Sequence, residues 1–197
     1  DKVLDLSAAT DGRLPTRMLD LIERSTDYLS LAREAVKAPR ASALIPIIEV
    51  KLKAPLPDPP SLKDFFAFEA HAQAGAARRG EPLPAEWYEL PAYYKGNHRE
   101  VYGPEELIPW PSYTRRLDFE CEIACVVGRK GRDLSPEQAA SHIFGYMIFN
   151  DFSARDIQKK EMANRMGPAK SKDFAHAFGP WLVTAAEVDP HRDFSMS

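Results

Sequence analysis

The chain has 197 residues, of which 44% are hydrophobic and 28% charged, and its formal net charge at pH 7 is −3. This composition is typical of a globular protein and excludes general disorder and collagen-like structure. The sequence has no basic stripe to bind a nucleic-acid backbone, and its longest apolar runs fall far short of the ~20 residues that span a bilayer. We therefore expect neither a nucleic-acid partner nor a membrane segment.

The first 60 residues predict an N-terminal segment that is separate from the rest of the chain. Apolar residues recur at helical spacing between residues 15 and 37, which predicts an amphipathic helix. Residues 43–52 predict a strand, with an edge or a bend at Pro46. A stiff linker follows, which contains Pro55, Pro57, Pro59 and Pro60. We predict a helical segment, strand and linker over residues 1–60 and a main domain over residues 61–197.

The main domain has a mixed pattern in which strands dominate after residue 113. Ser61 is a candidate cap for a helix that carries Asp64 and His71 on one face. The expected elements that follow are a strand at 117–127, a helix at 135–141, a strand at 146–149, a helix at 156–162 and a strand at 181–184. These elements predict a β-rich α+β fold.

Residues 117–127 place carboxylates on one side of a strand. Side chains alternate along a strand, so Asp118, Glu120 and Glu122 share one face. The other face is apolar and is expected to be core; it carries Leu117, Phe119, Cys121, Ile123 and Cys125. The acidic face is either an ordinary solvent-facing surface or a platform for a hard cation such as Mg²⁺ or Ca²⁺. We predict that Cys121 and Cys125 are reduced residues in the core of a cytoplasmic protein.

Five further residues are candidate site residues, and their chemical roles compete with structural ones. Asp151 ends an apolar strand and is either a third metal ligand or a turn residue. Arg155 and Gln158 share a helix face, where Arg155 either clasps a substrate carboxylate or pairs with a neighbouring acid. His71 is either a general base or a structural residue. Lys170 lies in a loop, where it either stabilises a developing negative charge or is solvated.

Two motifs together carry a specific resemblance. The strand Leu-Asp-Phe-Glu-Cys-Glu at 117–122 is followed by Asn-Asp-Phe-Ser-Ala-Arg-Asp-Ile-Gln at 150–158. With the segments 90–96 and 169–174, they make residues 44–188 resemble the fumarylacetoacetate hydrolase family. The resemblance implies a β-roll catalytic domain, a homodimer, and a Mg²⁺ cofactor that Ca²⁺ or Mn²⁺ can replace. It also implies that the chain ends before the family's C-terminal part.

The resemblance implies a Mg²⁺-dependent hydrolase that cleaves a carbon–carbon bond in a 1,3-diketo acid. Two alternatives stay open. The chain could be an isomerase, decarboxylase or dehydratase of 2-oxo acids on the same metal site, or a non-catalytic metal- or ligand-binding domain. By position, the family's roles fall on the following residues: Asp64, Glu120, Glu122 and Asp151 as metal ligands; His71 as the base; Lys170, with Lys172 as a rival, as the site lysine; and Tyr94, Arg155 and Gln158 as substrate contacts.

Overall fold

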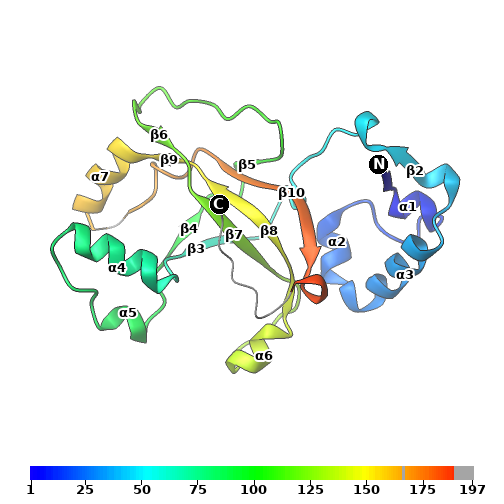
Figure 1. Cartoon of the computed structure of the whole chain (residues 1–197), viewed down its shortest axis with the longest axis horizontal. Helices are drawn as coiled ribbons and strands as arrows, with labels where there is room; N and C mark the ends of the chain where they lie inside the picture. The colour runs from blue at the N-terminus through cyan, green and yellow to red at the C-terminus, as the bar shows by residue number, and fades with distance from the viewer. Residues whose placement is uncertain (166, 189–197) are drawn as a thin grey trace.

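A four-stranded sheet forms the centre of the computed structural model, which describes residues 1–165 and 167–188 (Figure 1). The strand order is β5, β10, β8, β7. The strands are β5 (Val101–Tyr102), β10 (His176–Thr184), β8 (Ile143–Asp151) and β7 (Cys121–Val127). β5 runs parallel to β10, whereas β10, β8 and β7 pair antiparallel. The expectation of a mixed, β-containing fold is confirmed.

Three two-stranded sheets accompany the central one. They are β1 (Lys2–Leu4) with β2 (Leu44–Pro46), β3 (Leu62–Phe65) with β4 (Tyr93–Gly96), and β6 (Leu117–Asp118) with β9 (Ser153–Ala154). All three pairs are antiparallel. The strand predicted at 43–52 is shorter than expected, because β2 ends at Pro46 and a 3₁₀ turn follows at Ile47–Glu49. β2 is one of two strands in its sheet, so the edge position that Pro46 predicted is confirmed.

The helices gather at two ends of the molecule (Figure 1). At one end lie α1 (Leu6–Ala9), α2 (Met18–Glu23) and α3 (Ser25–Lys37), and at the other lie α4 (Glu69–Arg78), α5 (Glu86–Glu89) and α7 (Arg155–Ala163). The remaining helix is α6 (Pro136–Ala140), and 3₁₀ turns occur at Ala41–Ala43, Ile47–Glu49 and Ala185–Glu187. None of the helices in the described residues has the length and apolar character needed to cross a membrane.

Two predicted helices differ from the observed ones. The helix expected over residues 15–37 is divided at Arg24, whose backbone (φ −115°, ψ 28°) is not helical. The helix expected after Ser61 is instead β3, and helical structure begins only at Glu69. β3 pairs with β4 in a register that sets Asp64 opposite Tyr94. This long-range pairing outweighs the local capping signal of Ser61, as tertiary context commonly does.

The strand predicted at 117–127 is divided into β6 and β7, which pair with different partners, β9 and β8. The remaining predicted elements of the main domain are confirmed. Ser135 caps α6 in a reciprocal capping box with Gln138. The strand predicted at 146–149 lies within β8, the helix at 156–162 within α7, and the strand at 181–184 within β10.

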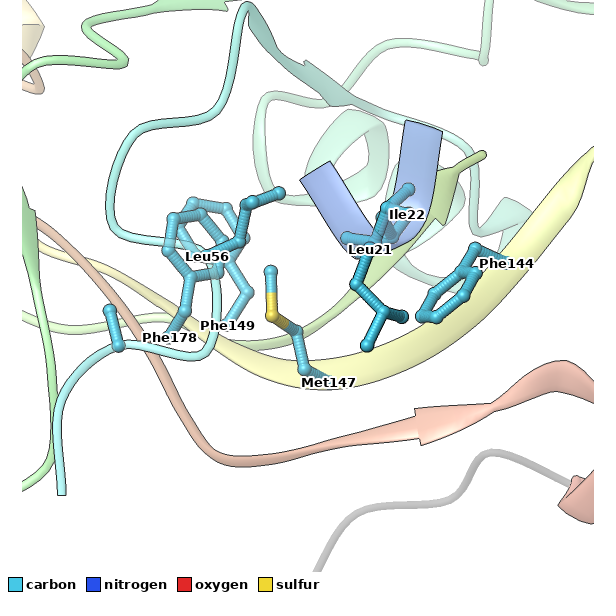
Figure 2. Packing of buried hydrophobic residues seen from close by; sticks show 9 residues of the cluster. Leu21, Ile22, Leu56, Phe144, Met147, Phe149 and Phe178 are labelled. Atoms are coloured by element: carbon cyan, nitrogen blue, oxygen red, sulfur yellow. The ribbon is translucent and has the colours of Figure 1, made fainter. Parts of the chain in front are cut away.

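The hydrophobic core joins the N-terminal segment to the sheet. Figure 2 shows Leu21 and Ile22 of α2 packed over Phe144 and Met147 of β8. The same cluster contains Leu56 of the proline-rich segment, together with Phe149 and Phe178. Each such fully buried side chain stabilises the fold by about 1.5–3 kcal/mol. The core therefore fixes the position of β8, whose last residue is Asp151.

The inner face of β7 is the opposite of the one predicted. Phe119 is 62% exposed, and Cys121 and Cys125 are exposed and form no disulfide, so the expectation of a core face with core cysteines is wrong. Val126 is buried instead and belongs to the core cluster. Since Glu122 lies an even number of residues from Val126, it shares this inner face. The carboxylate of Glu122 thus lies on the inner face of β7.

Candidate metal centre

Four carboxylates from separate parts of the chain meet at one end of the central sheet. They belong to Asp64 in β3, Glu120 just before β7, Glu122 in β7 and Asp151 at the end of β8. One ligand atom from each residue lies within 4.8 Å of those of the others. Asp151 is fully buried and the other three are half-buried. The structure therefore brings together all four residues that the sequence suggested as metal ligands.

Backbone pairing places these four side chains. Glu120 and Asp151 exchange two backbone hydrogen bonds, with N···O distances of 3.1 and 3.0 Å. Asp64 is brought in by the pairing of β3 with β4, which sets it opposite Tyr94. The Tyr94 hydroxyl in turn donates to Asp151 Oδ2 over 2.6 Å. The cluster thus depends on the sheets rather than on a flexible loop, which favours a precise site.

The crowded carboxylates alter one another's acidity. Burial, followed by repulsion from Asp151, raises the pKa of Asp64 to about 7. Burial and the neighbouring carboxylates of Asp64 and Asp151 raise the pKa of Glu122 to about 8. Burial alone would also raise the pKa of Glu120, but the adjacent cations Lys172 and Arg155 reverse this effect and lower it. Without a metal ion, the cluster therefore retains protons at neutral pH.

A buried lysine occupies one side of the cluster. The Lys172 ammonium is 2.6 Å from Glu120 Oε2 and 2.5 Å from Asp151 Oδ2, and its side chain is 2% exposed. An ammonium in this position neutralises part of the acidic charge of the cluster. Burial and the Asp151 carboxylate raise the pKa of Tyr94, so this hydroxyl stays protonated and continues to donate.

Arg155 is bound to carboxylates rather than extended into open space. Its Nε donates to Asp118 Oδ2 over 2.8 Å, and its Nη1 donates to Glu120 Oε1 over 2.6 Å. Nη1 also donates to Gln158 Oε1 over 3.1 Å. These contacts hold Glu120 between two cations, Arg155 and Lys172. They engage Nε and Nη1 of Arg155 and Oε1 of Gln158, two residues that the sequence suggested for the substrate.

The loop at 167–173 decides which lysine enters the site. Glu161 Oε2 accepts hydrogen bonds from the backbone N–H of Ala169 (3.1 Å) and from the backbone N–H and hydroxyl of Ser171 (3.2 and 2.6 Å). Ser171 is fully buried, and Lys172 follows it into the cluster. Sequence reasoning preferred Lys170, but the bonds to Glu161, which it overlooked, direct Lys172 inward.

Lys170 faces a different part of the surface. Its ammonium lies 4.2 Å from the centre of the Tyr113 ring. Together with Tyr113 and Asp173 it lines an open cleft of about 570 Å³ whose lining includes none of the four carboxylates. Lys170 is therefore a poor candidate for the site lysine.

His71 lies on the first turn of α4 and is exposed. Its ring meets the Phe66 ring edge-on, with centroids 5.3 Å apart and an interplanar angle of 85°. Within the described residues, no hydrogen bond or ion pair links His71 to the four carboxylates. The structure thus places His71 on the helix that follows Asp64 but does not join it to the cluster.

The donor set fits a hard divalent cation. Four carboxylates supply the oxygen ligands that Mg²⁺, Mn²⁺ and Ca²⁺ prefer. Asp151 Oδ1 is buried and makes no hydrogen bond of normal geometry to any described residue, so it retains an unused acceptor. A cation would also offset the mutual repulsion that raises the pKa of Asp64 and Glu122.

Comparisons with known proteins find similar sequences and one matching family. The model of the family "Fumarylacetoacetate (FAA) hydrolase C-terminal" matches residues 62–197. The chain is 30% identical over 209 residues to an oxaloacetate tautomerase of Bacillus subtilis, covering 98% of this chain and 66% of the relative. It is 35% identical over 149 residues to a fumarylacetoacetase of Dictyostelium discoideum, covering 64% of this chain and 35% of the relative.

A solved structure shares the fold. Maleylpyruvate hydrolase from Sphingobium sp. SYK-6, solved with manganese(II) and pyruvate, superposes with a TM-score of 0.70 at 21% identity, covering 96% of this chain and 63% of that chain. The present chain spans 56% of the length of another similar relative, an oxaloacetate tautomerase of Xenopus laevis. The chain thus corresponds to part of the length of these relatives.

Proposed function

The chain belongs to the fumarylacetoacetate hydrolase family, and from this premise we propose that it is a divalent-metal-dependent hydrolase of a 1,3-diketo acid. The reaction is the cleavage of a carbon–carbon bond in an acylpyruvate-like substrate. The cofactor is Mg²⁺, which Mn²⁺ or Ca²⁺ can replace. A homodimer stays a prediction from the family resemblance.

The convergence of Asp64, Glu120, Glu122 and Asp151 is the observation that carries this proposal. Four carboxylates that serve only as surface charges would spread apart, since like charges repel. Here three strands hold them within 4.8 Å of one another on the inner side of the sheet. Such a cluster destabilises the protein unless protons or a cation neutralise it, and a cation site explains why the fold maintains it.

The chemistry needs a stabilised negative charge. A divalent cation held by the four carboxylates would polarise an oxo group and offset charge that develops on it. In the proposed reaction, water gains a bond to the carbonyl carbon while His71 takes its proton. The carbon–carbon bond then breaks, its electron pair leaves on the α-carbon, and that carbon finally takes up a proton. The products are a carboxylic acid and pyruvate, with one water consumed.

Three residues of this chain have proposed supporting roles. The Lys172 ammonium stabilises the developing enolate charge, since it is buried against Glu120 and Asp151. Arg155 keeps Glu120 in place through its hydrogen bond. Tyr94 keeps Asp151 in place in the same way. A direct substrate contact of Tyr94, Arg155 or Gln158 stays a prediction.

A second candidate is a 2-oxo acid tautomerase. It is favoured by the extent of the similarity, because the oxaloacetate tautomerase of Bacillus subtilis matches nearly the whole chain whereas the fumarylacetoacetase matches a shorter part. Tautomerisation moves one proton between carbon and oxygen and needs no attacking water. The four carboxylates and Lys172 suit both reactions, since both pass through an enolate-like charge.

Product analysis tests the two reactions against each other. The chain is incubated with Mg²⁺ and either an acylpyruvate or enol-oxaloacetate, and the products are identified by chromatography and mass spectrometry. A hydrolase gives pyruvate and a second acid, and EDTA abolishes their formation. Accelerated enol-to-keto conversion without cleavage would support the tautomerase instead. Absence of both reactions in a chain that binds the metal would refute the hydrolase proposal. Glu122→Gln serves as the control that removes one ligand.

A further inference from the structure

One buried histidine next to the carboxylates has no part in the proposed reaction. His176 begins β10 and stands opposite Asp151 in the register of β10 with β8. Its side chain is 0% exposed, and its ring stacks on that of Phe149, with centroids 5.9 Å apart and an interplanar angle of 19°. A Cβ at Gly96 would lie 3.1 Å from Nε2, so the backbone of β4 lies close to the imidazole. Neighbouring groups thus confine the ring beside Asp151.

His176 and Asp151 face each other with unused hydrogen-bonding atoms. By strict geometry, neither ring nitrogen of His176, nor Asp151 Oδ1, makes a hydrogen bond to the described residues. Burial lowers the pKa of the ring, and a backbone group of Asn97 that also lies near the ring acts to raise it. Nε2 and Oδ1 are 3.6 Å apart. The other oxygen of Asp151 already accepts from Tyr94 and Lys172. Leaving buried donors and acceptors unpaired is costly, and a movement of about half an ångström would bring Nε2 and Oδ1 within hydrogen-bond distance.

We infer that His176 is a positioning residue for Asp151: its Nε2–H donates to Oδ1 and orients this carboxylate toward the other three ligands. A carboxylate oxygen has two lone pairs, so Oδ1 can accept from His176 with one and bind a cation with the other. The inference rests on the proposed metal centre. Both the Nε2–H tautomer and the imidazolium carry the required proton, so the role does not depend on the charge of the ring. Residues that hold a metal ligand from behind typically contribute 10–100-fold to metal affinity.

The test measures Mn²⁺ affinity rather than turnover. Mn²⁺ is titrated into the 197-residue chain and the dissociation constant is obtained by calorimetry and from the electron paramagnetic resonance signal of free Mn²⁺. His176→Phe keeps a ring to stack on Phe149 but removes the donor, and we expect affinity to fall about 10–100-fold. His176→Gln places an amide N–H close to the position of Nε2, and we expect affinity within about threefold of the native chain.

Two further variants separate positioning from packing. His176→Asn carries an amide too short to reach Asp151, so we expect it to bind Mn²⁺ at least tenfold more weakly than His176→Gln. His142→Gln removes a histidine that is hydrogen-bonded to Arg129 and precedes the start of β8, the strand that ends at Asp151, and affinity should not change. If His176→Phe does not fold, the comparison of the Gln and Asn variants gives the answer.

Three results would overturn the inference. Native affinity in a folded His176→Phe chain would show that the donor is not needed. Equal losses in the Phe, Gln and Asn variants would show that His176 acts through packing. A native chain that binds no Mn²⁺ would refute the metal centre itself, and this outcome differs from the first two because it precedes any substitution at residue 176.

Discussion

Metal binding should release protons, because the cluster is partly protonated without a cation. At pH 7, Asp64 with a pKa of about 7 is about half protonated, and Glu122 with a pKa of about 8 is about nine-tenths protonated. A divalent cation binds the deprotonated carboxylates. Loading the site at pH 7 should therefore release roughly one to two protons per chain, and loading at pH 9 close to none.

Calorimetry in several buffers measures this number. Mn²⁺ is titrated at pH 7 and at pH 9 into the chain in buffers that differ in ionisation enthalpy, and the slope of the observed enthalpy against that quantity gives the protons released. The same titration of Glu122→Gln corrects for binding elsewhere on the surface. Tight one-to-one binding without proton release at pH 7 would refute the reasoning, since Asp64 and Glu122 would then already be ionised.

The same pKa shifts affect stability without metal. Asp64 and Glu122 have higher pKa values in the folded chain than the usual 3.8 and 4.5. Below about pH 4 both groups are protonated and add to the free energy of unfolding. This added stability is lost as the pH rises to about 8, where both groups ionise in the folded chain. A divalent cation opposes the loss, so the increase in melting temperature on adding Mn²⁺ should be larger at pH 8.5 than at pH 6. Equal increases at both pH values would contradict this linkage.

The remaining predictions concern single residues. Glu122→Gln should abolish the gain of about 2.7 kcal/mol in unfolding free energy that a cation at 100 times its Kd confers on the native chain; an unchanged gain in denaturant titrations would exclude Glu122 as a ligand. Lys172→Met should destabilise the metal-free chain by about 3 kcal/mol, because it leaves Glu120 and Asp151 without their buried cation, whereas the matched variant Lys170→Met should have little effect; similar melting temperatures for both would contradict this assignment. His71→Gln should keep native Mn²⁺ affinity and lose turnover with an acylpyruvate; full activity would exclude His71 as the base.

The sequence predicted the members of the acidic cluster better than their surroundings. Alternation along a strand correctly placed Glu120 and Glu122 together, and the strand end correctly suggested Asp151. Alternation alone does not say which face is inner, however, and the more apolar face of β7 proved to be the exposed one. Asp64 was expected on a helix but lies in β3. The local sequence could not show this, because β3 pairs with β4, whose residues are about 30 positions away.

The site lysine and the positioning groups were harder to predict. Lys170 and Lys172 are equivalent in a sequence pattern, and only the hydrogen bonds of Glu161 to the loop distinguish them. His176 lay in a segment that gave no signal of its own, since its register opposite Asp151 arises from the pairing of β10 with β8. Local patterns thus identified residues with suitable chemistry, whereas tertiary pairing decided their neighbours.

A crystal of this chain soaked in Mn²⁺ and measured at the manganese absorption edge gives the most direct test of the metal centre. We predict one strong anomalous peak within about 2.0–2.6 Å of oxygens from Asp64, Glu120, Glu122 and Asp151. No peak among these four carboxylates, with manganese bound elsewhere or not at all, would contradict the account.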